Sequence, residues 1–437
     1  MKTLIPFLLT IVLTACGGGG GSGPTAIVPK SDIFTLGSVS FNSNYSFVPS
    51  MVQADFTGDG SKHVVVSGWL ASGQTVSRNP DPEVKIFKIN SSGTGTDVTN
   101  SILGGSFSTS VNWPIVADFN NDGIDDIFFG GFTDAPSFNQ NPSTVFLSRP
   151  GQSHEKIVFA DQSWVHSSLA VDLNGDGRLD ILGNLGDLWL NQGAGNFTHS
   201  NLTWAGGPFA GGGGLCAGDF NNTGRKQIVF PDAYDQQTQQ NGTFIFDVDT
   251  NLNITKLGAM PTPYFDRNSL TKLSHNVSCV VADFNQDGRL DVVVISARAD
   301  TVKQSMVQLY INQGNYVFSD ATDTAFAAYN QNTFSSYVPV IKDFNNDSLP
   351  DLWLMNMDYS GLVADQIWIN HNTGVFTESN STKITKLLTE FLNTNNSYAN
   401  VSGIALPVSI NNQLVLVLTS VNSNTLHVGS IKIEWQY

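Results

Sequence analysis

The sequence predicts an all-β protein built as a β-propeller, and three observations carry this prediction. A nine-residue phrase, written DFNNDGIDD in one full copy, recurs along the chain. Short apolar runs rich in β-branched residues flank the copies, as expected for buried strands. The copies begin 47 to 64 residues apart, a spacing typical of propeller blades with several short strands each. Their first residues are Asp55, Asp118, Asp172, Asp219, Asp283 and Asp343.

The start of the chain is expected to lie outside the fold. Lys2 and the apolar run Leu4–Leu13 have the composition of a signal peptide over residues 1–15, which is too short to span a bilayer. The next residues, Thr14-Ala15-Cys16, complete a sequence that resembles the lipobox of bacterial lipoproteins, which implies that Cys16 is lipidated. A plain secretory signal with an incidental cysteine is the alternative.

Residues 16–30 are expected to be a lipidated, glycine-rich tether that holds the body, residues 31–437, at a membrane. Because Gly17 and not an aspartate follows the cysteine, the resemblance to lipoproteins implies the outer membrane. Whether the body faces the periplasm or the outside is left open. The net charge of −16 argues against nucleic acid as a partner, since nucleic acids bind basic patches. A monomer is the simplest expectation.

The repeated phrase places carboxylate or amide oxygens at its positions 1, 3, 5 and 9. Oxygen ligands on a short loop with a glycine at the sharp turn suit a hard cation, and calcium is the expected ion. An EF-hand does not fit, because that loop ends on a glutamate at position 12 and lies between helices. An ordinary Asp/Asn/Gly turn is the alternative. The expected ligands are Asp118, Asn120, Asp122, Asp126, Asp172, Asn174, Asp176, Asp180, Asp283, Asn285, Asp287, Asp291, Asp343, Asn345, Asp347 and Asp351.

Two other copies of the phrase depart from this pattern. The copy with Asp55 and Asp59 ends on His63, a poor calcium ligand, so partial occupancy is expected. The copy at 219–227 has Thr223 and Gln227 where acids belong and is expected to hold no ion. The sequence therefore predicts about four structural calcium ions.

One of the four full copies has Ser348 where the others have glycine. Calcium is still expected there, with either backbone strain or a different turn at that position.

Each unit also has a second half that predicts a β-hairpin. Leu188–Gly193 is followed by Phe197, Leu309–Gly314 by Phe318, and Ile367–Asn370 by Phe376. Each reads as a strand, a tight Asn/Gly turn and another strand. Two strands around the loop plus this hairpin make a four-stranded antiparallel blade. Weaker forms of the third strand are Ile86–Lys88, Val145–Leu147 and Phe244–Phe246.

Loops and hairpins together resemble the FG-GAP/VCBS repeats of integrin-like β-propellers over roughly residues 31–437. The resemblance implies seven blades, whereas six loops are present. Residues 403–420 and 425–433 predict three strands of a seventh blade without metal ligands. Residues 33–41 are then expected to supply its fourth strand and to close the ring, which removes exposed edges. A short amphipathic helix is expected at 382–393.

Two cysteines remain in the body. Cys216 and Cys279 precede the loops of the fourth and fifth blades by three and four residues. Because successive strand residues face opposite sides, these offsets allow the two side chains to face each other in neighbouring blades. A disulfide would persist in an oxidising compartment, but two separate buried thiols are the expectation.

The resemblance places the calcium loops on one rim of the ring and the starts of the inner strands on the opposite rim, around the channel mouth. Residues five to eight places before each first aspartate should gather there: Phe47, Trp113, His166, His275 and Tyr337, with Asn112 and Asn276 beside them. Aromatic and amide groups around a concave mouth suit a sugar or a peptide side chain. The alternative is that Trp113 and Tyr337 only pack against their neighbours.

We therefore expect a cell-envelope lipoprotein whose calcium-stabilised propeller is a recognition or adhesion module for a glycan or protein ligand. No motif pairs a nucleophile with a base, and no Gly-rich phosphate loop follows a strand, so no catalytic residue is predicted. Fold alone does not choose a function. A lyase-like, polysaccharide-active enzyme and a structural protein of envelope assembly stay open as alternatives.

Overall fold

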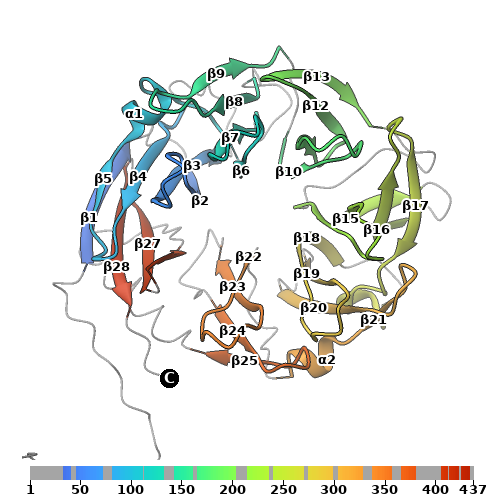
Figure 1. Cartoon of the computed structure of the whole chain (residues 1–437). Coiled ribbons are helices and arrows are strands. Elements are labelled where there is room, and N and C mark those ends of the chain that lie inside the picture. The colour runs from blue at the N-terminus through green and yellow to red at the C-terminus, as the bar shows by residue number, and fades with distance from the viewer. Residues whose placement is uncertain are drawn as a thin grey trace, which may run out of the picture.

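The computed structural model describes fifteen stretches of the chain, and strands β1 to β28 within them form seven four-stranded sheets. Every pairing within these sheets is antiparallel, and the sheets are arranged as blades around a central axis (Figure 1). The predicted all-β, seven-bladed propeller is therefore confirmed. The described residues are 33–40, 46–71, 81–111, 113–131, 142–160, 165–202, 214–235, 240–269, 274–298, 304–327, 337–356, 366–379, 405–411, 413–422 and 425–433.

The first four blades follow the chain in order from the innermost strand outward. Blade one contains β2 (Ser46–Ala54), β3 (Lys62–Ala71), β4 (Lys85–Ile89) and β5 (Gly95–Asp97). Blade two contains β6 (Ile115–Ala117), β7 (Asp126–Phe129), β8 (Thr144–Leu147) and β9 (Glu155–Val158). Blade three contains β10 (Ser168–Val171), β11 (Asp180–Gly183), β12 (Asp187–Gly193) and β13 (Asn196–Asn201). Blade four contains β14 (Cys216–Gly218), β15 (Gln227–Asp235), β16 (Gln240–Val248) and β17 (Ile254–Ala259).

The last three blades complete the ring. Blade five contains β18 (Ser274–Ala282), β19 (Asp291–Arg298), β20 (Gln304–Asn312) and β21 (Phe318–Asp320). Blade six contains β22 (Tyr337–Lys342), β23 (Asp351–Asn356), β24 (Gln366–Asn370) and β25 (Phe376–Ser379). Blade seven contains β26 (Ala405–Ile410), β27 (Gln413–Asn422), β28 (Thr425–Ile433) and β1 (Ile33–Ser40). The predicted hairpins are the β12–β13, β20–β21 and β24–β25 pairs.

The two ends of the described chain meet in blade seven. Strand β1 pairs antiparallel with β28, with Ile33 opposite Ile431 and Ser40 opposite Thr425. The predicted closure by residues 33–41 is therefore confirmed. The N-terminal strand protects the outer edge of the last blade, so the ring is held shut by a pairing between residues nearly 400 positions apart.

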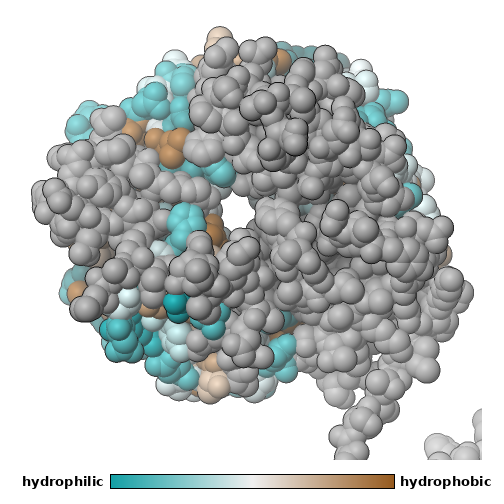
Figure 2. Space-filling model, turned by 180° about the vertical axis from the view of Figure 1, so that it is seen from behind, coloured by the Kyte–Doolittle hydropathy of each residue, from teal (hydrophilic) through white to brown (hydrophobic). Residues whose placement is uncertain are grey.

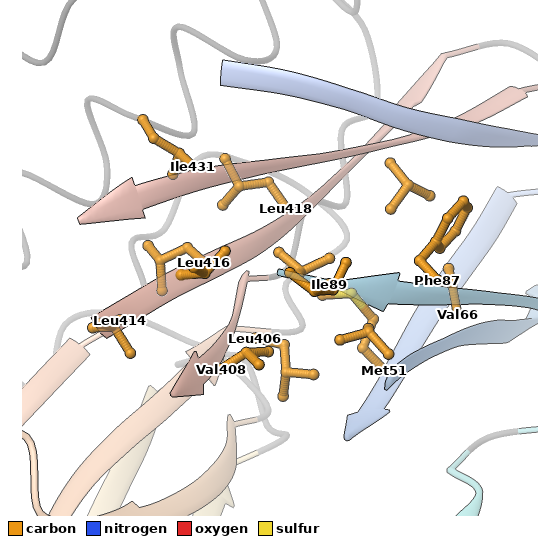
Figure 3. Close-up of a cluster of buried hydrophobic side chains, with 14 of the residues drawn as sticks. Met51, Val66, Phe87, Ile89, Leu406, Val408, Leu414, Leu416, Leu418 and Ile431 are labelled. Atoms are coloured by element: carbon orange, nitrogen blue, oxygen red, sulfur yellow. The ribbon is translucent and has the colours of Figure 1, made fainter. Parts of the chain in front are cut away.

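The core is divided among the junctions between neighbouring blades. On β3, Val64 and Val66 pack in the cluster shared with blade seven, whereas Val65 packs toward blade two. This is the alternation expected of a strand that is covered on both faces. Figure 3 shows the cluster between blades seven and one, where Leu416 and Val408 approach Met51 and Ile89. An opening remains at the centre of the ring (Figure 2).

In the described stretches, three short helical turns occur that were not predicted: α1 (Thr99–Leu103), α2 (Thr322–Ala325) and the 3₁₀ turn η2 (Tyr264–Asp266). The helix expected at 382–393, the signal peptide, Cys16 and the tether lie outside the described residues. Within the part of the chain that the structure describes, no helix is both long enough and apolar enough to cross a membrane.

Candidate cation loops and channel mouth

Six loops link the first and second strands of blades one to six, and all six make the same turn. In the blade-two loop, Asp118 at position 1 accepts the N–H groups of Asp122 at 3.1 Å and Gly123 at 2.8 Å. The blade-four loop has lost its other acids, yet Asp219 accepts the N–H groups of Thr223 and Gly224 at 2.8 and 2.6 Å. The first aspartate therefore folds the loop whether or not the other predicted ligands are present.

The four full copies bring two oxygen atoms together in the same way. In blade two, the N–H of Asp122 is shared by Asp118 Oδ1 at 3.1 Å and Asn120 Oδ1 at 3.0 Å. Oxygens that accept the same N–H must lie close to each other. The same sharing occurs at the N–H groups of Asp176, Asp287 and Asp347. Side-chain oxygens from positions 1 and 3 thus converge beside the position-5 aspartate, an all-oxygen set that suits calcium.

The position-9 side chain has a structural role that the sequence did not indicate. Asp126 is buried, and its Oδ2 accepts the N–H of Phe119 at 2.7 Å while its Oδ1 accepts the N–H of Ser148 at 2.5 Å. Asp180, Asp291 and Asp351 accept the matching pair of N–H groups in their blades. Burial raises the pKa of Asp126, Asp180 and Asp291 to about 6. This carboxylate joins the loop to the third strand of its blade.

The two incomplete loops keep this contact with other side chains. His63 Nδ1 accepts the N–H of Phe56 at 3.3 Å, and Gln227 Oε1 accepts that of Phe220 at 3.0 Å. Both side chains are buried. A hydrogen-bond acceptor therefore occupies position 9 even where the set of predicted calcium ligands is incomplete.

The fit of the four full loops to calcium rests on positions 1, 3 and 5. Among the described residues, no group of three or more His, Cys, Asp or Glu side chains forms a metal cluster. The position-9 carboxylates point inward and the third donor is an asparagine, which accounts for this result. In two loops the position-7 arginine contacts the position-5 acid, as Arg289 Nη2 does with Asp287 at 2.5 Å. The donor chemistry of positions 1, 3 and 5 fits a calcium ion. Coordination by the position-9 carboxylate stays a prediction.

The backbone conformation of Ser348 decides between backbone strain and a different turn in the blade-six loop. Its φ is +69°, and Gly288 at the same position in blade five has +83°. The turn is therefore the same, and serine occupies a left-handed conformation that glycine adopts without steric cost. The alternative of a different turn is wrong.

A buried asparagine at the end of the third strand joins neighbouring blades. Asn312 Nδ2 donates to Phe220 O at 2.8 Å, from blade five to blade four. Asn191 makes the same bond to Phe119 O and Asn370 makes it to Phe284 O. All three side chains are fully buried. The asparagine of the hairpin motif was assigned to a turn, and its contact with the preceding blade was missed because that partner is far away in sequence.

The expectation of two separate thiols is wrong. Cys216 and Cys279 form a disulfide with a Cα–Cα distance of 5.7 Å. The reason is that the inner strands of blades four and five meet side by side here: Gly214 bridges Ser278 in parallel, and its N–H donates to Val277 O at 2.8 Å. The opposite parity of the two cysteines did allow facing side chains.

Two of the predicted mouth residues lie within electrostatic range of each other. His166 is two residues before the start of β10 and His275 is the second residue of β18, so both stand where an inner strand starts. Burial, with a smaller effect of the His275 charge, lowers the pKa of His166 to about 4. The two imidazoles of blades three and five are therefore close enough to interact. The backbone of His166 is fixed by Asn184, whose Oδ1 accepts its N–H at 3.0 Å.

The other residues predicted at the channel mouth have different surroundings. Trp113 is half-buried and packs against the cluster of blades seven and one. Asn276 is buried, donates to Thr243 Oγ1 at 2.6 Å and accepts from Ser296 Oγ, so its amide is used inside the protein. The side chains of Phe47 and Tyr337, and Asn112 as a whole, lie outside the described residues.

Comparison with known proteins gives one family match. The profile described as FG-GAP-like repeat matches residues 55–129 and 283–354, which contain the loops of blades one, two, five and six. The chain therefore carries FG-GAP-like repeats. No curated protein matches it.

Two solved structures are among those to which the chain is similar. One is an Agrocybe aegerita lectin that recognises non-reducing terminal N-acetylglucosamine; its identity is 15% and its TM-score 0.47, with 76% of this chain and 79% of that chain covered. The other is Trypanosoma rangeli sialidase in complex with sialic acid, at 10% identity and a TM-score of 0.35, with 94% and 58% covered. At these values neither similarity bears on the chemistry of this chain.

Proposed function

We propose that this protein is a lipid-anchored recognition module of a bacterial cell envelope, stabilised by calcium, that binds a glycan or a protein ligand at its channel mouth. The binding role rests on His166 and His275, which stand at the starts of the inner strands of blades three and five and within electrostatic range of each other. The N–H of His166 is held by Asn184, and Asn276 next to His275 is held by a buried hydrogen bond; such a rigid mount lowers the entropy cost of binding.

The calcium part of the proposal rests on the side-chain oxygens of positions 1 and 3, which converge beside the position-5 aspartate. In blade two these are the oxygens of Asp118 and Asn120, beside Asp122. A bound ion would offset the negative charge of the two aspartates and would hold the rim in one conformation. Loops of extracellular modules bind calcium at roughly 10⁻⁴ to 10⁻³ M.

The envelope location is supported by two independent features. The lipobox-like Ala15-Cys16 implies a lipid anchor, and the Cys216–Cys279 disulfide is of the kind that persists in an oxidising compartment. Labelling with radioactive palmitate, compared between the native protein and Cys16→Ala, tests the anchor. Equal labelling would contradict it.

The binding role is tested with a glycan array and a pull-down of envelope proteins, both in calcium buffer. We expect a ligand whose binding falls at least tenfold in His166→Ala and in His275→Ala. His371→Ala is the matched control, because His371 is exposed on the hairpin of blade six, away from the mouth. Equal binding by all variants would contradict the mouth assignment. Shortening of a polysaccharide by the native protein would favour the enzyme alternative instead.

A further inference from the structure

The N-terminal strand β1 begins beside the hairpin turn of blade one (Figure 1). Its first residue, Ile33, pairs with Ile431 near the end of β28. In the turn between β4 and β5, a Cβ atom on Gly93 would lie 3.3 Å from the ring of Phe34 and 3.4 Å from the backbone N of Lys432. The start of β1, the end of β28 and this turn therefore lie together at one end of the two blades.

This end of the blades is the rim of the cation loops. Strand β4 reaches the turn at Ile89, and Ile89 pairs with Lys62, which is position 8 of the blade-one phrase. The hairpin turn thus lies on the same rim as the loop. Strand β1 therefore starts on the cation-loop rim, and its other end, Ser40, lies on the side of the channel mouth.

The length of chain before β1 limits how far this rim can lie from a lipid anchor. Cys16 stands 17 positions before Ile33, and residues 17–23 are glycine except for Ser22. A glycine-rich chain of this length spans about 20 to 25 Å on average. The longest strand of blade seven, β27, is 10 residues long and extends about 30 Å from one rim to the other. Placing the mouth rim at the lipid would stretch the chain past the whole blade, which costs conformational entropy.

The charge of blade seven favours the same orientation. Its four strands lie within residues 33–40 and 405–433, which contain no aspartate or glutamate. Lys432 stands near the end of β28 on the cation-loop rim. Each of the other six blades has at least one aspartate in its loop on this rim. Because anionic lipids repel carboxylates, the corner of the rim at blade seven is the part that a membrane surface repels least.

We propose that the cation-loop rim, with blade seven nearest, faces the membrane that holds the lipid on Cys16, and that the channel mouth opens away from this membrane. The proposal rests on the lipid anchor of the proposed function. It also names the source of the ligand. The mouth binds a glycan or protein that comes from the surrounding medium or from a facing surface, and it does not contact the lipid headgroups of its own membrane.

The test measures energy transfer from a fluorophore on the protein to an acceptor on lipid headgroups. The full-length lipidated protein is added to preformed phosphatidylethanolamine/phosphatidylglycerol vesicles that contain a headgroup-labelled lipid. One cysteine for the fluorophore is introduced on either side of blade one, as Ser92→Cys or as Ser108→Cys. Both serines are exposed. Ser92 lies in the turn between β4 and β5, whereas Ser108 bridges Glu83, just before β4 starts on the mouth side.

The two labels lie about 20 Å apart along the blade, so energy transfer should be at least about twofold stronger from Ser92→Cys than from Ser108→Cys. Equal transfer, or stronger transfer from Ser108→Cys, overturns the orientation and leaves the anchor intact. Flotation of the vesicles tests the anchor separately, with Cys16→Ala forms of both variants as controls that should not float. If the Cys16→Ala forms float equally, or if the native protein does not float, the anchor fails and the orientation fails with it. Circular dichroism verifies that each variant is folded.

Discussion

The Asn312 side chain donates a hydrogen bond of 2.8 Å to the backbone carbonyl of Phe220, which lies 92 residues earlier in the chain and in the preceding blade. Its Oδ1 accepts the N–H of Gly314 at 2.8 Å, and its Nδ2 also donates to Leu290 O at 3.1 Å. A single buried side-chain amide thus connects a hairpin turn, the end of the cation loop and the neighbouring blade.

Replacing this amide tests the connection. Asn312→Ala should lower the free energy of unfolding by about 2 kcal/mol, because it leaves buried backbone groups unpaired. Asn370→Ala is the matched variant and should cost less, since Asn370 Oδ1 has no hydrogen-bond partner. Urea unfolding measures the free energy of unfolding of both variants. Equal losses, or a smaller loss at Asn312, would show that the three-way connection adds no stability.

Ser348 provides a substitution that should stabilise the protein. With φ at +69°, Ser348→Gly relieves a left-handed conformation and should raise the free energy of unfolding by about 1 kcal/mol. Gly288→Ser, at the same position in blade five, should lower it by a similar amount. Chemical denaturation of the two variants checks the opposite signs, and a loss of stability in Ser348→Gly would refute the explanation.

The disulfide closes a long stretch between two inner strands, with a sequence separation of 63. The double variant Cys216→Ala/Cys279→Ala should lose about 2 to 4 kcal/mol of stability. A reductant should lower the melting temperature of the native protein and leave that of the double variant unchanged. If the reductant lowers the melting temperature of the native protein and of the double variant equally, the disulfide is not the cause of the lost stability.

His166 should make folding sensitive to acid. Its pKa is lowered to about 4 by burial, whereas the unfolded chain takes up this proton near pH 6.5. The contribution to stability is therefore complete above pH 6.5 and is lost as the pH falls toward 4. Relative to the native protein, His166→Gln should gain stability across this window, while the exposed-site control His371→Gln should not. Parallel stability curves for all three proteins would contradict the assignment.

The sequence predicted the blades well because their signals are local. The turn chemistry of each DFNNDGIDD-like phrase and the Asn/Gly hairpin lie within a few residues of each other, and the position of β1 followed from counting strands. The contacts between blades could not be predicted in this way. The Asn312–Phe220 bond and the disulfide depend on which strand faces lie at each junction, and these partners are distant in sequence.

We propose that calcium bound in the loops of blades two, three, five and six holds the ring together. Thermal unfolding of the protein lacking residues 1–24 tests it most directly, in about 10 mM calcium, in equal magnesium and with a chelator. A site with a dissociation constant of about 1 mM contributes roughly 1.4 kcal/mol under these conditions, so several sites should raise the melting temperature by several degrees. Magnesium should act weakly, and Asp122→Ala should remove part of the calcium effect. Identical melting in all three conditions would contradict the claim and leave the loops as turns held by their own hydrogen bonds.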